Sequence, residues 1–233
     1  MSSLKPIKVY GGTGPNPPKI IMILEELRLP YELSSLTISD VKKPEYLAVN
    51  PNGRMPAIYD PNSDLTLWES GAIVEYLVEK YDTDHRISFP TGSNASYLTK
   101  QWLYYQTTGQ GPYYGQAVWF TVYHHEKLPS AIERYTKEIE RVMSVVDGHL
   151  AKQKETTAGA EGPWLVGDKV TFADIAWYMW QTVANTVIGE EAINYAKYTN
   201  LKDWIERLGA RDSVKKALAL AVTERAKQAK QAQ

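Results

Sequence analysis

Residues 50–73 read NPNGRMPAIYDPNSDLTLWESGAI, and this segment predicts a strand, a turn, a second strand and the start of a helix. Two short apolar runs, residues 57–59 and 65–68, are separated by the turn-forming letters DPNSD. Met55-Pro56 follows a turn-rich loop, and we expect a cis peptide bond there because an X-Pro bond lowers the cis penalty to about 0.5–1 kcal/mol. Since proline cannot donate to a ladder, the backbone of Met55 is left to pair with an extended ligand.

Glu69-Ser70-Gly71 follows the second strand and opens the helix. The Ser70 hydroxyl and the first N–H groups of the helix favour an anion at this corner. Each residue also has a structural interpretation, with Ser70 as the helix N-cap and Glu69 as a favourable charge beside it. Together with Met55-Pro56, however, the pair favours a peptide-like ligand that carries a carboxylate.

Composition narrows the classes of function. The formal net charge of −1 over 233 residues gives no electrostatic reason to expect nucleic acid or a membrane surface as a partner. We find no membrane span and no signal peptide, so we expect a cytoplasmic protein. The chain has no cysteine, and any reactive thiol must therefore come with a ligand. The four histidines lack the spacing of metal ligands, so we expect no metal.

The chain as a whole predicts two domains. Strand, helix and strand patterns occupy residues 7–10, 20–27 and 31–38, ahead of the segment that opened this section. The order β-α-β followed by β-β-α predicts a thioredoxin-like α/β domain over residues 1–84. Residues 85–94 predict a linker, because they contain turn formers and lack periodicity. Helical periodicity dominates after it, so residues 95–233 predict an all-α domain.

Residues 170–175 read VTFADI and start one of these helices. Thr171 and Asp174 have the spacing of a capping box, and Val170 and Ile175 occupy the positions of a hydrophobic staple. We interpret this motif as structural.

The two motifs V-N-P-N-G-R-M-P-A-I and W-E-S-G-A-I, in this order, resemble the glutathione site of the glutathione transferase superfamily. The resemblance implies that Met55, before Pro56, pairs with the cysteinyl backbone of glutathione, and that Glu69 and Ser70 hold its γ-glutamyl end. Lys42 and Arg54 lie where a cation can meet the glycyl carboxylate. The capping box also resembles the one in the helical domain of this superfamily, so both halves of the chain support it.

The loop GGTGPNPPK, residues 11–19, is where the resemblance places the group that holds the glutathione sulfur. It matches neither dinucleotide-binding nor P-loop spacing, so we expect no nucleotide. Aligning Lys19-Ile20 with the family's basic-aliphatic pair puts Gly14 at the usual serine or cysteine position. The pattern G-P-N-P-P-K-I-x-x-x-L-E-E-L instead resembles the Asn-type branch, namely the bacterial nu class and the fungal group related to the yeast prion-forming nitrogen regulator. In that branch an asparagine, here Asn16, contacts the sulfur, sometimes with a nearby threonine, here Thr13.

Asn16 also fits a structural role as an N-cap with Pro17 at the first helical position, and the two roles are compatible. The positive end of the helix would lower a thiol pKa from its reference of about 8.5. Asparagine cannot act as a base in this pH range, but it can donate an N–H hydrogen bond to a thiolate, and the Thr13 hydroxyl can add another. Tyr10, at the end of the first strand, is a weaker candidate for this role.

Residues 101–120 read QWLYYQTTGQGPYYGQAVWF and predict an aromatic helical stretch broken at residues 108–112. Beside the break, Tyr104, Tyr113 and Tyr114 are predicted to line a pocket for the acceptor substrate. For Trp102 and Trp119 we expect a core or dimer role. The resemblance further implies that an arginine of the helical domain approaches glutathione. The candidates are Arg134 and Arg141.

These observations predict a glutathione transferase that uses glutathione as co-substrate, with Asn16 and Thr13 at its sulfur. Its thiolate would reduce disulfides by glutathione-dependent exchange, conjugate small electrophiles in detoxification, or both. The resemblance implies a cytoplasmic homodimer. One alternative is a glutathione-binding regulatory protein with little catalysis, although the chain shows no Asn/Gln-rich extension before its first strand. A module that does not bind glutathione would require both motifs to be accidental.

Overall fold

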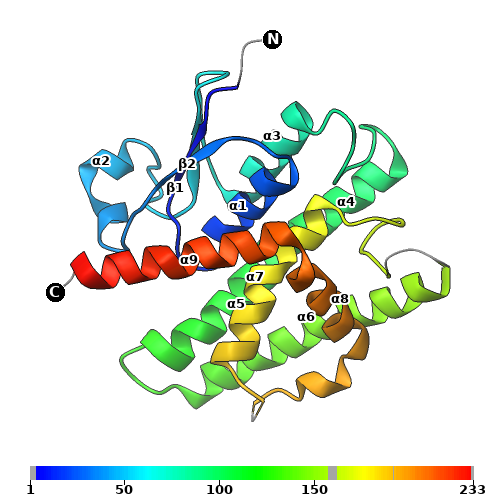
Figure 1. Ribbon diagram of the computed structural model, residues 1–233. Helices are drawn as coiled ribbons and strands as arrows, with labels where there is room; N and C mark the ends of the chain where they lie inside the picture. The colour runs from blue at the N-terminus through cyan, green and yellow to red at the C-terminus, as the bar shows by residue number, and fades with distance from the viewer. Residues whose placement is uncertain (1–3, 157–161, 191, 232–233) are drawn as a thin grey trace. The chain divides into compact units, whose positions relative to one another are not determined.

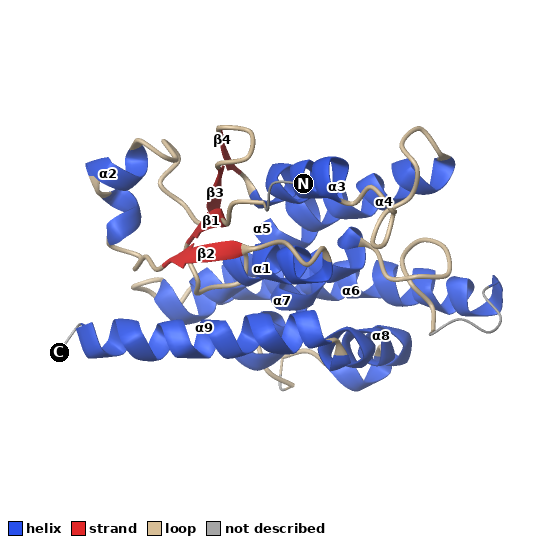
Figure 2. Cartoon of the chain, turned by 45° about the horizontal axis from the view of Figure 1, so that its top comes forward, coloured by secondary structure: helices blue, strands red, loops and turns tan. Residues whose placement is uncertain are grey.

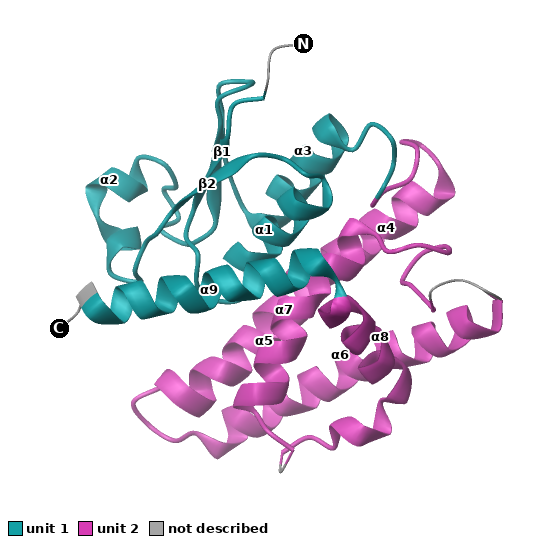
Figure 3. Ribbon diagram, in the orientation of Figure 1, with its two compact units in different colours: residues 1–86, 211–233 teal, residues 87–210 magenta. Residues whose placement is uncertain are grey.

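The computed structural model describes residues 4–156, 162–190 and 192–231 (Figure 1). The extreme ends of the two predicted domains, residues 1–3 and 232–233, lie outside this part. The chain forms two compact units, Met1–Arg86 with Arg211–Gln233 and Ile87–Ala210 (Figure 3). Within the described ranges, no helix has both the length and the apolar character needed to cross a membrane.

The first unit is built on a four-stranded mixed sheet (Figure 2). Its strands are β1 (Ile7–Tyr10), β2 (Tyr31–Ser34), β3 (Ala57–Asp60) and β4 (Leu65–Trp68). Their order is β2-β1-β3-β4, with β1 parallel to β2 and the other pairs antiparallel. The predicted thioredoxin-like order of elements is confirmed, and β3 is a central strand.

Three helices accompany the sheet: α1 (Pro17–Glu26), α2 (Pro44–Leu47) and α3 (Ser70–Tyr81). Helix α1 packs against β1 and α3. All of its first eight residues are buried, and seven of them are apolar or proline. The single exception in this buried run is Lys19, which brings a charged group into the interior.

The C-terminal helix α9 (Asp212–Gln231) belongs to the first unit, where it packs against α1. The Arg211 guanidinium donates to both carboxylate oxygens of Glu26, at 2.7 and 2.9 Å, and Lys216 pairs with Glu25 at 2.7 Å. The sequence analysis grouped this helix with the helical domain. Periodicity predicts that such a segment is a helix with one buried face, but not which unit covers that face.

The second unit is helical, as predicted. Its helices are α4 (Asn94–Tyr105), α5 (Gly111–Val118), α6 (Pro129–Thr156), α7 (Phe172–Val187) and α8 (Thr199–Ala210). The predicted break at residues 108–112 is wrong, because the chain continues through a π-helical turn at Gln106–Gln110 into α5. Pro112 lies in the first turn of α5 and, having no backbone N–H, donates no hydrogen bond to the π-helical turn before it.

The capping box at the start of α7 is confirmed. Asp174 accepts hydrogen bonds from the Thr171 backbone and hydroxyl, at 2.8 and 2.6 Å. Its other carboxylate oxygen accepts from Leu165 N–H at 2.9 Å and from Trp204 Nε1 at 3.0 Å. Asp174 therefore stabilises the interior of the second unit, in keeping with the structural interpretation of the motif.

Candidate functional site

The Met55-Pro56 peptide bond is cis, as predicted, and it lies directly before β3. The preceding loop is held by two side chains that the sequence analysis did not single out. Tyr46 Oη and Asn50 Nδ2 both donate to the carbonyl oxygen of Arg54, each at 2.7 Å. Asn50 is buried, and its Oδ1 accepts from the Asn52 N–H at 2.9 Å, as turn asparagines do. The N-P-N-G letters are thus the signal by which Asn50 could have been found.

Gly11 brings the loop after β1 up against Met55. Its φ is +94°, a conformation that favours glycine, and a Cβ atom there would lie 2.5 Å from Met55 Sδ. No other residue type fits this contact without displacing Met55. The loop that carries Thr13 and Asn16 is therefore packed directly on the residue before the cis proline.

Asn16 occupies the N-cap position of α1 with Pro17 after it, as predicted, but its side chain forms no capping hydrogen bond. Asn16 Oδ1 instead accepts from Lys19 Nζ at 3.2 Å. Pro17 and Pro18 have no N–H, so the helix start presents fewer backbone donors to an anion than an ordinary helix. Thr13 lies on the same loop and is partly exposed.

Lys19 is the residue that the sequence analysis used only for alignment and missed as a site residue. Its side chain is 1% exposed, and Nζ donates to Ser70 Oγ at 3.1 Å as well as to Asn16. Burial lowers the pKa of Lys19 to about 7, although the Glu69 carboxylate acts in the opposite direction. The only sequence signal was a lysine inside an apolar helix face. One ammonium thus joins two predicted ligand residues that come from different elements.

Glu69 and Ser70 lie at the start of α3, but not in the way that the structural interpretation expected. Ser70 is the first helical residue and Glu69 occupies the N-cap position, so the prediction of Ser70 as the N-cap is wrong. Glu69 has a φ of 71°, which for a residue other than glycine is strained by about 1–3 kcal/mol. Its Oε1 accepts from Asn52 Nδ2 at 3.4 Å, which links it to the loop before Met55. Such strain is typical of ligand sites.

Lys42 and Arg54, the predicted partners of the glycyl carboxylate, border that same loop. Lys42 Nζ donates to the carbonyl oxygen of Gly53 at 2.9 Å, and the Arg54 side chain is exposed. The structure therefore brings predicted residues of the first unit to one region, through side-chain contacts of Lys19, Asn52 and Lys42 and through the close approach of Gly11 to Met55. No group of His, Cys, Asp and Glu among the described residues has the geometry of a metal site.

The predicted acceptor residues lie on α4 and α5 of the second unit. Tyr104 is 54% exposed, whereas Tyr114 is fully buried and its hydroxyl donates to Gln181 Oε1 at 3.1 Å. Tyr113 is half-buried, with the Arg141 guanidinium 5.9 Å from its ring centre. Tyr104 and Tyr113 thus present surface that a ligand can touch, and the Tyr114 side chain is committed to the interior.

The two candidate arginines of the helical unit differ in their surroundings. Arg141 donates to Glu138 at 2.9 Å, while the Arg134 guanidinium lies 5.9 Å from the ring centre of Tyr135. Of the tryptophans expected in the core or a dimer interface, Trp102 is buried and Trp119 is 50% exposed.

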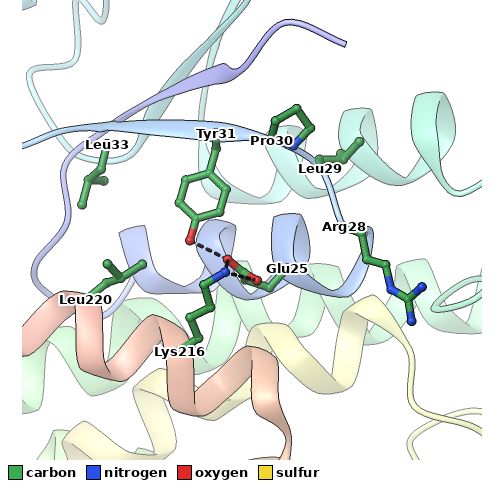
Figure 4. A pocket seen from close by; sticks show the side chains of 8 residues that line it. All are labelled: Glu25, Arg28, Leu29, Pro30, Tyr31, Leu33, Lys216 and Leu220. Atoms are coloured by element: carbon green, nitrogen blue, oxygen red, sulfur yellow. Dashed lines mark hydrogen bonds and ion pairs between the residues drawn. The ribbon is translucent and has the colours of Figure 1, made fainter. Parts of the chain in front are cut away.

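A hollow of about 720 Å³ lies on the first unit between the C-terminal end of α1, β2 and α9 (Figure 4). It is lined by Glu25, Arg28, Leu29, Pro30, Tyr31, Leu33, Lys216 and Leu220. Tyr31 Oη donates to Glu25 at 2.6 Å, and Lys216 pairs with the same carboxylate. Glu25 follows Asn16 by nine residues of helix, or roughly 13 Å at 1.5 Å per residue. None of the predicted ligand residues lines this hollow, so it is separate from the candidate site.

Comparison with known proteins matches both parts of the chain to one family. The family description "Glutathione S-transferase, N-terminal domain" matches residues 13–85, and "Glutathione S-transferase, C-terminal domain" matches residues 112–212. The glutathione S-transferase-like protein gedE of Aspergillus terreus is 59% identical over 220 residues, which are 94% of this chain and 97% of that protein.

Two solved structures extend the comparison to three dimensions. The glutathione transferase URE2P6 from Phanerochaete chrysosporium, in complex with oxidized glutathione, is similar with a TM-score of 0.86 and 43% identity, covering 94% of this chain and 98% of that one. Ure2p in complex with glutathione has a TM-score of 0.83 and 34% identity, covering 93% and 100%. The chain therefore belongs to the glutathione transferase superfamily, alongside Ure2p and its fungal relatives.

Proposed function

We propose that this chain binds glutathione and activates its thiol, chiefly for disulfide exchange, with conjugation to small electrophiles as a second reaction. The proposal rests on the hydrogen-bonded cluster of Asn16, Lys19 and Ser70. This cluster connects the loop at residues 11–19, which we propose to hold the glutathione sulfur, to the start of α3, which we propose to hold the γ-glutamyl group. The similar transferase URE2P6 was solved with oxidized glutathione, the disulfide that such a reaction would produce.

In this proposal Asn16 and Thr13 hold the glutathione sulfur by hydrogen bonds. An amide N–H and a hydroxyl are donors, and donors to a thiolate favour its ionised form. Met55 pairs with the cysteinyl backbone, Glu69 and Ser70 hold the γ-glutamyl end, and Lys42 or Arg54 meets the glycyl carboxylate. Tyr104 and Tyr113 are the proposed contacts for the acceptor, and Arg134 or Arg141 is the proposed arginine of the helical unit.

The disulfide reaction balances without a cysteine in the protein. A glutathione thiolate attacks one sulfur of the substrate disulfide, which forms a mixed disulfide and releases the other sulfur as a thiolate. A second glutathione thiolate then attacks the glutathione sulfur of the mixed disulfide, forming oxidized glutathione and releasing the second substrate thiolate. The two released thiolates take up the protons that the two glutathiones lost.

The test is a paired assay of the purified protein with glutathione and either a disulfide or an aryl halide, repeated with Asn16→Ala. We expect disulfide reduction to be the stronger activity, and kcat/KM to fall about a hundredfold in the variant, the effect of losing one preorganised donor. Asn94→Ala, at an exposed asparagine of the second unit, is the matched control and should keep full activity.

The other outcomes of this assay select among the alternatives. Dominant aryl transfer would make conjugation the main reaction. If both activities are absent while glutathione still raises the melting temperature, the chain is a glutathione-binding regulatory protein. The proposal extends to a cytoplasmic homodimer, for which light scattering of the purified protein and imaging of a tagged chain are the measurements.

A further inference from the structure

We propose that Lys19 is a positioning residue of the glutathione site, whose ammonium turns the donors of Asn16 and Ser70 toward a bound glutathione. This inference rests on the proposed function and deepens it. Lys19 touches neither reacting sulfur in the proposal; it acts through the two side chains to which it donates, at 3.2 and 3.1 Å.

The Asn16 amide turns its oxygen toward Lys19. A lysine ammonium has three donors and no acceptor, so the end of the amide that faces it has to be the carbonyl oxygen. The Nδ2 group is thereby turned away from Lys19. With the opposite orientation, Asn16 would direct oxygen lone pairs toward the site and repel a thiolate. Lys19 thus decides whether Asn16 offers a donor or an acceptor to the sulfur.

The Asn16 side chain forms no capping bond to the backbone of α1. An asparagine at an N-cap normally turns its oxygen toward the N–H of the second or third helical residue. Here the first two helical residues are Pro17 and Pro18, and no side-chain capping bond is formed. Lys19 takes over this restraint. It is the third residue of a buried helix, so its backbone is held by the packing of α1.

Lys19 orients Ser70 in the same way. Its oxygen accepts from Lys19, and the single hydroxyl hydrogen is therefore directed away from the ammonium. Asn16 and Ser70 are thus oriented in the same way. Each accepts a hydrogen bond from Lys19 and directs its own donor group away from it. This arrangement suits a ligand with two anionic groups, such as the thiolate and the α-carboxylate of glutathione.

The charge of Lys19 fits this role. An ammonium that is 1% exposed carries a desolvation cost. Burial lowers its pKa, and Glu69 is the charged side chain that acts against this effect. The α-carboxylate of a glutathione bound beside Ser70 would stabilise the ammonium further, so ligand binding and the charged state of Lys19 support each other.

The experiment is a double-mutant cycle of Lys19→Met and Asn16→Ala, read out as the pKa of the bound glutathione thiol from its ultraviolet thiolate absorbance. We expect Lys19→Met alone to raise this pKa by about one unit, and to lower kcat/KM about tenfold mainly through kcat. In the Asn16→Ala background the same change should produce no further shift, because the positioned group is already gone. Lys19→Arg, which keeps charge and donors, should restore most of the wild-type value.

Two further variants make the cycle decisive. Lys19→Gln keeps a donor without the charge, so it should fold and give an intermediate thiol pKa even if Lys19→Met does not fold. Lys80→Met, at an exposed lysine of α3, is the matched control and should leave the thiol pKa unchanged.

If the wild type binds and activates glutathione, two results would contradict the role of Lys19 and leave the proposed function standing. One is an unchanged thiol pKa in folded Lys19 variants; the other is an equal shift with and without Asn16, which would mark a direct effect of charge. Absence of glutathione binding in the wild type, seen as an unchanged melting temperature, would overturn the proposed function together with the inference.

Discussion

The two ends of α1 differ in which groups stabilise the charged side chains near the protein interior. At the C-terminal end, Glu25 and Glu26 are matched by Lys216 and Arg211, which fasten α9 to the helix. At the N-terminal end, Lys19 is more deeply buried, and it donates hydrogen bonds to the neutral side chains of Asn16 and Ser70. Ion pairs hold the first arrangement, whereas the second gains from the negative charge of a ligand. The comparison indicates that the buried ammonium of Lys19 marks the functional end of this helix.

The pKa shifts at the two ends follow the same division. Burial acts to raise the pKa of Glu26, but hydrogen bonds from Arg211 and Ser213 bring it below its ordinary value. For Lys19, burial prevails and lowers the pKa from 10.5 to about 7. The carboxylate at one end is therefore stabilised in its charged form, and the ammonium at the other end is destabilised.

The largest expected effect is a pH dependence of stability that belongs to Lys19. Because its pKa is lower in the folded protein, the unfolded chain binds more protons between about pH 7 and 10.5, and the free energy of unfolding rises with pH in this window. The cost of the buried charge is fully present below pH 7. Wild type without glutathione should therefore gain on the order of a few kcal/mol relative to Lys19→Met between pH 6 and 10.

Urea unfolding of both proteins across this pH range is the measurement. Lys80→Met should follow the wild-type curve throughout. A constant difference between wild type and Lys19→Met would mean that Lys19 is not destabilised by burial, and the contrast between the two ends of α1 would fail.

The next effect is at the C-terminal end. Glu26→Ala leaves the Arg211 guanidinium, whose side chain is 25% exposed, without its bidentate partner, and should cost about 2 kcal/mol of stability. Glutathione binding by the folded variant should be unchanged. Denaturant unfolding and glutathione titration check the two halves of this prediction, with Glu32→Ala, at an exposed carboxylate of β2, as control. A fall in glutathione affinity would show that the two ends are coupled.

Glu69→Gly should have a smaller effect on stability and a clear one on binding. Glycine relieves the strain of the 71° φ but adds flexibility to the unfolded chain, so the net gain should be about 1 kcal/mol or less. Glutathione affinity should fall, because the carboxylate is lost. Glu69→Ala loses the carboxylate and keeps the strain; it should bind as weakly without any gain in melting temperature. Equal stability of the two variants would argue against strain at Glu69.

The smallest effect is expected for Lys216→Ala. Its side chain is 60% exposed, and exposed ion pairs contribute little, so stability should fall by no more than about 0.5 kcal/mol. The difference should shrink further in high salt, because exposed charges are screened. Thermal unfolding of wild type and variant at low and high salt measures this difference in stability. A loss above about 1.5 kcal/mol would mean that the Lys216–Glu25 pair contributes strongly to the attachment of α9.

Local sequence signals predicted much of the fold correctly. The cis bond at Met55-Pro56, the strands on either side of DPNSD and the capping box of Thr171 and Asp174 all depend on neighbouring residues. The same signals failed at the break predicted for residues 108–112, where the chain forms a π-helical turn that leads into α5. They also could not show that the Tyr114 side chain is buried, since aromatic spacing does not tell which side of a helix is covered.

By itself, the sequence determined the order of elements, the motifs of the glutathione site and the superfamily, because these rest on short-range patterns and on similarity to relatives. Only the tertiary structure decided that α9 packs on α1, that Glu69 rather than Ser70 takes the N-cap position of α3, and that Lys19 joins Asn16 to Ser70. The physical reason is distance along the chain. Ser70 lies 51 residues after Lys19, and such a pair meets only once the sheet has aligned the helices that carry it.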